Sequence, residues 1–150
     1  MKYLQFKEIY ILILLSLILF FSSINSLPVL DRDEARYVQA SKQMIESNNY
    51  SSIKFQNEYR SKKPIGIYWL QVLSINLLAD IKEINSKSNQ IVGDHIWKYR
   101  IVSAISAFFS ILLLYLLSKP IFGKKESFYG AIILACGLLF IAESHIAKTD

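Results

Sequence analysis

Residues 101–118 read IVSAISAFFSILLLYLLS, an apolar run that contains no charged side chain. A helix rises about 1.5 Å per residue, so this run would be about 27 Å long, close to the ~30 Å hydrocarbon core of a bilayer. Trp97, Tyr99 and Arg100 lie directly before it, and aromatic and basic residues suit a membrane interface. The stretch therefore predicts a transmembrane helix, and this prediction decides the fold class.

The composition of the whole chain agrees with a membrane protein. Of its 150 residues 53% are hydrophobic and only 19% are charged, whereas about a quarter are charged in soluble proteins. The mean hydropathy is +0.30 and the net charge +5. The single cysteine, Cys136, excludes a disulfide framework and a cysteine-based zinc cluster. The sequence has no glycine-rich phosphate loop, no dinucleotide fingerprint and no basic stripe, which excludes nucleotide-binding and nucleic-acid-binding classes.

Two further apolar runs flank the first. Residues 9–27 begin with IYILILLSLILFFSSI, which fits a cleaved signal peptide or an uncleaved anchor, and the later runs favour the anchor. Residues 128–146 form the third expected span, with small residues spaced for close helix packing. Pro120 and Gly123 are expected to break the helix between the second and third spans, within a lysine-containing cytoplasmic turn over residues 119–127.

A fourth run, PIGIYWLQVLSINLLA at residues 64–79, decides the topology. It would be about 24 Å long as a helix, which is short for a span, and it contains Gln71 and Ser74. If it lies along the interface, the N-terminus and the turn at 119–127 are both cytoplasmic, as the positive-inside rule requires. We therefore expect an all-α integral membrane fold with three transmembrane helices and one structured outer loop, residues 28–100, that carries juxtamembrane helices.

The outer loop begins with a predicted helix, DRDEARYVQASKQMIES at residues 31–47. Asp31 is a suitable N-cap, and Glu34 follows three residues later as in a capping box. Helical spacing places one group of side chains on a common face: Asp33, Arg36, Tyr37, Ala40 and Met44. An acid and an arginine three residues apart are also common on protein surfaces, so the pattern alone leaves a functional and an ordinary interpretation open.

Cations precede the second predicted helix of the loop. Arg60, Lys62 and Lys63 come directly before Pro64, and proline favours the first position of a helix. Cations are disfavoured at a helix N-terminus unless an anion joins them. The anion is either a lipid headgroup or one specific phosphate. Tyr68 and Trp69 fit interface anchoring or stacking on a sugar, and anchoring is the more common role.

Several short motifs occur in order along the chain: Asp33-Glu34-Ala35-Arg36-Tyr37 after the first apolar run, Lys63-Pro64, Tyr68-Trp69-Leu70, Arg100, Phe122-Gly123 and Thr149-Asp150. This series resembles the start of polyprenyl-phosphate-dependent glycosyltransferases with the GT-C fold, of the aminoarabinose-transferase and protein-mannosyltransferase type. The resemblance covers nearly the whole chain. The resemblance favours a functional role for the charged residues of the outer loop over an ordinary surface role.

The resemblance implies a multi-pass protein of the bacterial inner membrane whose long loop is periplasmic. Such enzymes transfer a sugar from a polyprenyl-phosphate carrier to a lipid, glycan or protein hydroxyl, as in lipopolysaccharide modification. It implies Asp33 and Asp150 as catalytic acids and Arg36 and Lys63 as ligands of the carrier phosphate. A carboxylate can accept the proton of the acceptor hydroxyl, which suits Asp33 as general base. The residues expected to line the pocket beside these are Glu34, Tyr37 and Tyr68.

No metal site is expected. Relatives commonly have an acid before the Lys-Pro pair, suited to a divalent metal, but Lys62 stands there, so no metal and no other cofactor is expected.

The chain is also expected to be incomplete as an enzyme. Three helices cannot enclose a lipid carrier and an acceptor, so we expect the N-terminal part of a longer enzyme that is inactive alone. The remainder is expected on the same or on a companion chain.

The alternative is a small non-catalytic three-helix membrane protein whose loop binds anionic lipid or a partner. Such a protein needs the cations but not Asp33. A transporter or channel subunit is disfavoured because the ionisable residues cluster outside the apolar runs.

Overall fold

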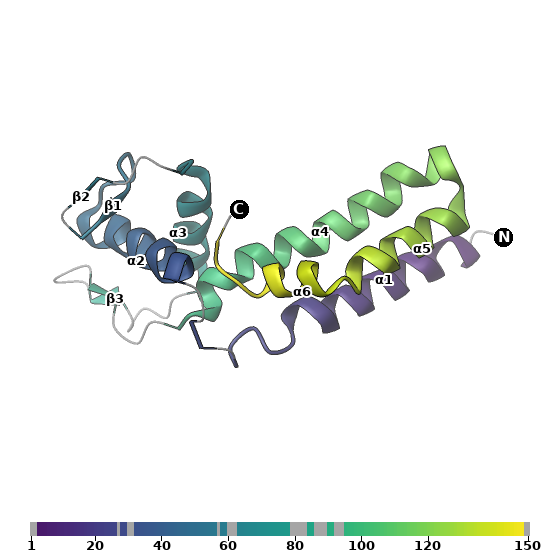
Figure 1. Cartoon of the computed structure of the whole chain (residues 1–150), viewed down its shortest axis with the longest axis horizontal. Coiled ribbons are helices and arrows are strands. Elements are labelled where there is room, and N and C mark those ends of the chain that lie inside the picture. The colour runs from purple at the N-terminus through teal and green to yellow at the C-terminus, as the bar shows by residue number, and fades with distance from the viewer. Residues whose placement is uncertain are drawn as a thin grey trace. The chain divides into compact units, whose positions relative to one another are not determined.

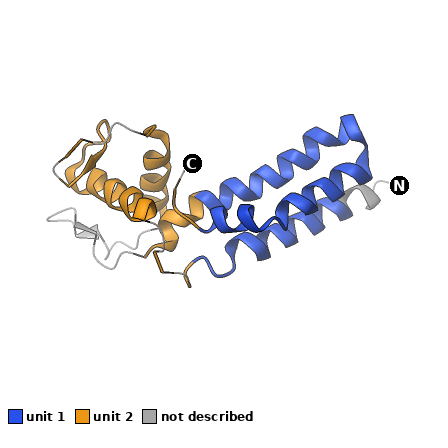
Figure 2. Cartoon of the chain, in the orientation of Figure 1, with its two compact units in different colours: residues 1–24, 103–145 blue, residues 25–102, 146–150 orange. Residues whose placement is uncertain are grey.

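The computed structural model describes residues 3–26, 28–29, 32–56, 58–59, 63–78, 84–85, 90–91 and 95–148. It is mostly helical, as expected (Figure 1). The chain divides into two compact units (Figure 2). The first, here called the apolar unit, comprises residues 1–24 and 103–145. The second, the loop unit, comprises residues 25–102 and 146–150 and contains the predicted outer loop.

The apolar unit is built from helices whose inward residues form one hydrophobic core. The helices are α1 (Tyr3–Phe21), the part of α4 (Trp97–Phe122) beyond residue 102, α5 (Lys124–Ala135) and α6 (Leu138–Ser144). Fully buried core residues include Leu12, Phe20, Ile111 and Ala131. Many other leucines on these helices are exposed, and an exposed apolar surface of this kind suits contact with lipid.

The turn between α4 and α5 is shorter than predicted. Pro120 does not end α4, which continues to Phe122, although a proline inside a helix removes one hydrogen bond and crowds the carbonyl four residues before it. Gly123 is the single residue between the helices, and its φ of 94° lies in the left-handed region that favours glycine. The turn expected over residues 119–127 therefore reduces to Gly123, and its flanking lysines lie on helices.

The predicted spans differ from the observed helices at their ends. The first run is helical to Phe21 and is followed by turns over 22–26 rather than a helix to 27. The third run forms two helices, α5 and α6, bent by 63° at the Cys136–Gly137 break. Among the described residues, α4 is the helix long and apolar enough to cross a membrane, and the bent α5–α6 pair passes the same test as one broken span. Three transmembrane helices thus stay a prediction.

A polar cluster ties α1 to its neighbours in the apolar unit. The Tyr115 hydroxyl donates a hydrogen bond of 2.7 Å to the Glu8 carboxylate. Lys124 Nζ lies 3.1 Å from the other Glu8 oxygen. The three side chains come from α1, α4 and α5, so a single carboxylate fixes the register of three helices against one another.

Replacing Glu8 by Ala is expected to destabilise the apolar unit by about 1–2 kcal/mol, because it removes charged hydrogen bonds that are only partly screened by water. The melting temperature of the chain in mild detergent, followed by circular dichroism, should fall by several degrees. Lys125→Ala is the matched control, since Lys125 is exposed beside Lys124. An unchanged melting temperature for Glu8→Ala would mean that the cluster does not hold the helices together.

The loop unit packs two helices around a second core. Its elements are α2 (Arg32–Ser47), β1 (Lys54–Phe55), β2 (Glu58–Tyr59), α3 (Gly66–Leu78), β3 (Ile84–Asn85), β4 (Gln90–Ile91) and the first turns of α4. β1 pairs with β2 and β3 with β4, both antiparallel. The all-α expectation is therefore wrong for these two short hairpins. The core contains Tyr37, Met44, Tyr68, Ile75 and Tyr99.

The two helices of the loop were well predicted. α2 ends at Ser47 as expected, where Asn48 adopts a positive φ. α3 has 13 residues, about 20 Å, and is too short to span a bilayer. One face of α3 is buried, and the opposite face exposes Trp69, Leu70, Leu73 and Leu77. Such a helix is apolar on both faces, which agrees with a position along a membrane interface.

Candidate functional site

Asp33 and Arg36 form an ion pair in the first turns of α2. Arg36 NH1 donates to Asp33 Oδ1 over 2.9 Å, and the side chains are 36% (Arg36) and 40% (Asp33) exposed. A guanidinium carries five N–H donors, so this one bond leaves Arg36 with donors suited to an anion. The structure therefore brings the expected catalytic acid and an expected phosphate ligand together at an accessible place.

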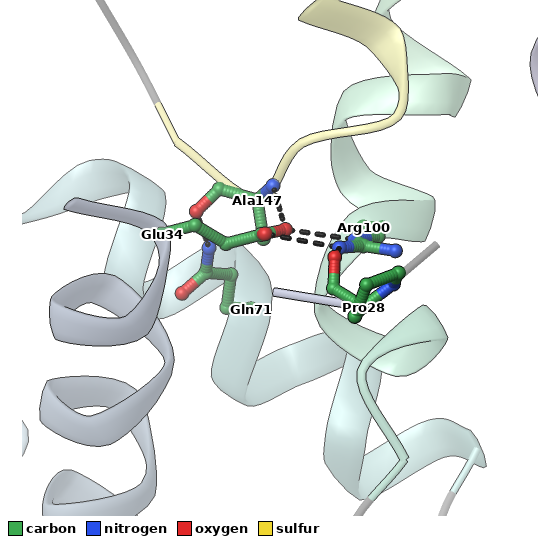
Figure 3. Close-up of polar contacts among 5 residues, drawn as sticks. All are labelled: Pro28, Glu34, Gln71, Arg100 and Ala147. Carbon is green, nitrogen blue, oxygen red and sulfur yellow. Dashed lines mark hydrogen bonds and ion pairs between the residues drawn. The ribbon is translucent and has the colours of Figure 1, made fainter. Parts of the chain in front are cut away.

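Glu34, the neighbour of Asp33, has a different position. Its side chain is fully buried and binds Arg100 of α4 in a side-on, two-bond arrangement (Figure 3). Arg100 Nε donates to Glu34 Oε1 over 2.7 Å and its NH2 to Oε2 over 2.9 Å. The same NH2 group donates to the carbonyl of Pro28 over 3.0 Å. The expectation that Glu34 lines a substrate pocket or caps its own helix is wrong, because its oxygens face a buried arginine.

The main chain of Ala147 joins this buried group (Figure 3). Its N–H donates to Glu34 Oε1 over 2.9 Å, and its carbonyl accepts a 3.3 Å hydrogen bond from Gln71 Nε2. Gln71 Oε1 in turn accepts a hydrogen bond from the Ser41 hydroxyl. Polar groups from α2, α3, α4 and the segment after α6 are thus satisfied together inside the loop unit, as buried polar groups must be.

Tyr37 and Tyr68 are stacked on each other rather than presented to a ligand. Their ring centroids are 5.1 Å apart with an interplanar angle of 26°, and both side chains are fully buried. Interface anchoring and sugar stacking are therefore both wrong for Tyr68 in this structure, since its ring belongs to the core between α2 and α3. Trp69 is about half exposed, but its indole N–H donates to the carbonyl of Tyr50.

α2 and α3 pack against each other in the core of the loop unit. Tyr37 contacts Tyr68, and Ser41 contacts Gln71. The first turn of α3 also lies near the chain that leaves α2, because Trp69 donates a hydrogen bond to the carbonyl of Tyr50. Lys63 is half-buried in the segment just before α3. The N-terminus of a helix carries partial positive charge, which together with a nearby cation favours an anion.

Some predicted site residues lie outside the described part of the chain. These are Asp150, Arg60 and Lys62, so the second acid and the argument against a metal stay predictions. Within the described residues, no group of three or more His, Cys, Asp or Glu side chains could hold a metal ion.

Sequence reasoning did not predict the roles of Arg100 and Gln71. Arg100 was expected as a membrane-interface cation, and Gln71 only as a reason against a membrane crossing. The available signal was a glutamine on an otherwise apolar helix, because a buried polar side chain needs a partner.

The comparison with known proteins decides the family. The family model for dolichyl-phosphate-mannose-protein mannosyltransferases matches residues 62–150, more than half of the chain. The chain belongs to this family. The match includes Lys63-Pro64, the start of α4 with Arg100, and the Ala147 segment, so the predicted resemblance to GT-C glycosyltransferases is confirmed.

Two similar relatives of this mannosyltransferase-family chain are arabinosyl transferases. The undecaprenyl phosphate-alpha-4-amino-4-deoxy-L-arabinose arabinosyl transferase of Pseudomonas savastanoi pv. phaseolicola is 30% identical over 73% of the chain and 18% of its own length. Arabinosyl transferase 2 of Pseudomonas fluorescens is 28% identical over 73% of the chain and 16% of its own length. The chain therefore spans less than a fifth of these relatives.

A solved structure shares the fold. ArnT from Cupriavidus metallidurans, in a crystal structure bound to undecaprenyl phosphate, matches 95% of this mannosyltransferase-family chain with a TM-score of 0.77. The identity is 18% and the match covers 24% of that protein, so the likeness concerns the fold.

Proposed function

We propose that the complete protein transfers a sugar from a polyprenyl-phosphate carrier to a hydroxyl of a lipid, glycan or protein at the outer face of the membrane. The observation that carries the proposal is the accessible Asp33–Arg36 pair in the first turns of α2. Lys63 lies just before the N-terminus of α3. The proposal brings this second cation to the same reaction as the acid and the arginine of α2.

The proposed chemistry assigns one role to each of the three side chains. The acceptor oxygen attacks the anomeric carbon while the bond from that carbon to the phosphate oxygen breaks, and the electron pair leaves with the phosphate. Asp33 accepts the proton of the acceptor hydroxyl. Arg36 binds the departing phosphate through paired N–H groups and Lys63 adds a compact charge, so both stabilise the negative charge that grows in the transition state.

The proposed membrane arrangement keeps the three expected spans, at residues 9–27, 101–118 and 128–146, with the loop unit outside the bacterial inner membrane. The exposed apolar face of α3, with Trp69, Leu70 and Leu73, would then lie on the bilayer surface, where a lipid carrier's phosphate group is found. The relatives named for undecaprenyl phosphate support this class of carrier.

We infer that transfer requires more protein than these 150 residues. The matched relatives are several times longer, and a polyprenyl carrier and an acceptor need a site that excludes water. The remaining part lies on the same polypeptide or on a companion chain. Purified alone, the chain is therefore expected to bind the carrier and not to transfer its sugar.

A second candidate function is non-catalytic binding of anionic lipid. The exposed apolar face of α3, next to Lys63, favours it, because an amphiphilic surface with a nearby cation binds anionic bilayers. The two functions differ in the headgroup that they require. A carrier site needs the terminal phosphate of a polyprenyl chain, whereas surface binding accepts any anionic lipid.

A binding measurement separates these functions. Arg36→Gln and Lys63→Gln are each expected to weaken binding of undecaprenyl phosphate to the detergent-solubilised chain roughly tenfold or more, because each removes a charged hydrogen bond worth about 1.5–3 kcal/mol. Lys42→Gln on the same helix α2 is the control and should bind normally. Native mass spectrometry or thermophoresis would give the affinities.

The lipid controls decide the interpretation. Undecaprenol, which lacks the phosphate, should bind at least tenfold more weakly than undecaprenyl phosphate to the unmodified chain. If phosphatidylglycerol competes as well as undecaprenyl phosphate, the carrier site is wrong and anionic-lipid binding is supported. If the Arg36 and Lys63 variants bind undecaprenyl phosphate as tightly as the unmodified chain, these residues are not ligands of the phosphate.

A further inference from the structure

Two buried side chains from two helices hold the main chain of Ala147. Glu34 of α2 accepts the Ala147 N–H over 2.9 Å, and Gln71 of α3 donates to the Ala147 carbonyl over 3.3 Å. Glu34, Gln71 and Ala147 are all fully buried. We call Glu34, Gln71, Arg100 and Ala147 the Ala147 clamp (Figure 3). The clamp fixes the segment after α6 within the loop unit through its backbone.

Arg100 determines how Glu34 can bind Ala147. Its guanidinium engages both carboxylate oxygens, at 2.7 and 2.9 Å, and a planar two-bond pair of this kind fixes the plane of the carboxylate. Glu34 Oε1 accepts both Arg100 Nε and the Ala147 N–H. The arginine is itself held by the Pro28 carbonyl. The direction of the hydrogen bond to Ala147 is therefore imposed from Arg100 through Glu34.

Stability alone does not account for this arrangement. Both side chains of the Glu34–Arg100 pair are 1% exposed, and removing two charges from water costs so much that apolar residues of similar size often give an equal or more stable core. Two apolar side chains could not bind a backbone N–H. What the charged pair adds is one defined position for the Ala147 peptide.

The held peptide lies near both proposed catalytic acids in the sequence. Glu34 directly follows Asp33, and Ala147 is three residues before Asp150. Fixing Ala147 to the residue next to Asp33 therefore holds the segment after α6, which leads to Asp150 in the sequence, at a defined place relative to α2.

We propose that Glu34 is a positioning residue that acts through the Ala147 clamp to hold the segment after α6 in place relative to Asp33. The catalytic part of this proposal rests on the proposed function, and the structural part does not. Glu34 itself touches no substrate in this account. Arg100 orients it, and Gln71 completes the clamp by donating to the Ala147 carbonyl.

The structural part is tested by a distance measurement on the full 150-residue chain in detergent. Spin labels are attached at Ser47→Cys, at the exposed end of α2, and at Lys148→Cys, with Cys136→Ser removing the native thiol. Double electron–electron resonance should give one narrow distance in this parent. Glu34→Gln should at least double the width of the distribution. Asp33→Asn, which removes the neighbouring exposed acid, should leave the distribution unchanged.

A second variant, Gln71→Met, keeps the test decisive if Glu34→Gln folds poorly. An unchanged narrow distance in Glu34→Gln, with parent-like helical circular dichroism, overturns the clamp. If that variant loses helical signal, Gln71→Met decides, because it keeps the Glu34–Arg100 pair while it removes the bond to the Ala147 carbonyl together with the bond from Ser41. A broadened distance in Gln71→Met supports the clamp, and a parent-like distance overturns it.

The catalytic part is tested in the complete protein by a split between kcat and KM. Glu34→Gln is expected to lower kcat roughly 100-fold, as small displacements of reacting groups do, and to leave KM for the donor within about twofold because Arg36 and Lys63 are untouched. A broadened distance with an unchanged kcat overturns the positioning role while the proposed function stands. If the unmodified complete protein transfers no sugar, the proposed function fails, and the distance measurement still decides the clamp.

Discussion

Replacing Asp33 by Asn in the complete protein is expected to lower the rate of sugar transfer roughly 10²–10⁴-fold, the range for loss of a general base. The amide has nearly the shape of the carboxylate but cannot accept a proton at neutral pH. Because Arg36 and Lys63 keep their charges, binding of undecaprenyl phosphate should change little. The measurement is initial-rate transfer from a radiolabelled donor, alongside donor affinity.

The control is the acid at the other end of the same helix. Glu46→Gln changes a partly exposed carboxylate in the last turn of α2 and should transfer sugar at the parent rate. Undiminished transfer by Asp33→Asn would remove Asp33 as the base. A loss of donor binding equal to the loss of rate would instead make Asp33 a ligand of the donor.

The second large effect concerns stability. Arg100→Leu is expected to destabilise the loop unit by about 3–5 kcal/mol, because it leaves the fully buried Glu34 carboxylate without its counter-charge. Hydrogen exchange followed by mass spectrometry on the detergent-solubilised chain should show faster exchange across α2 and α3, with the apolar unit's α5 little affected.

Two further variants give this prediction its control. Arg36→Leu breaks the other acid–arginine pair of α2, whose partners are 36% and 40% exposed, and should cost no more than about 1 kcal/mol. Glu34→Leu combined with Arg100→Leu removes both buried charges and should recover much of the lost stability. If Arg100→Leu and Arg36→Leu change exchange equally, the buried pair is not the support that the structure indicates.

Much of the fold could be predicted because it depends on local patterns. Helical spacing and the polar residues at both ends predicted the bounds of α2 to within one residue. The apolar run that contains α3 was too short to be predicted as a membrane span. The break at Gly137 was missed because a glycine in an apolar run is also common in packed transmembrane helices. Pro120 was expected to break the helix, but a proline disfavours a helix without always ending it, and α4 continues two residues further.

The site could be predicted where its residues are close together in the sequence, but not where contacts between distant residues determine a side chain's position. Asp33 and Arg36 are three residues apart, so helical spacing alone brings them together. Glu34 and Arg100 are 66 residues apart, and no local pattern indicates that the second acid of the motif is the one that turns inward. The sequence interpretation therefore assigned Glu34 to the pocket.

The clamp also has a consequence for how variation in this protein should be judged. Glu34 and Gln71 bind Ala147 through its main-chain N–H and carbonyl. The side chain at position 147 makes no polar contact in the clamp, so a comparison of side chains would overlook this residue. What the clamp specifies is the number of residues between α6 and the bound peptide. Inserting or deleting one residue between Ser144 and Ala147 would present the wrong peptide groups to Glu34 and Gln71.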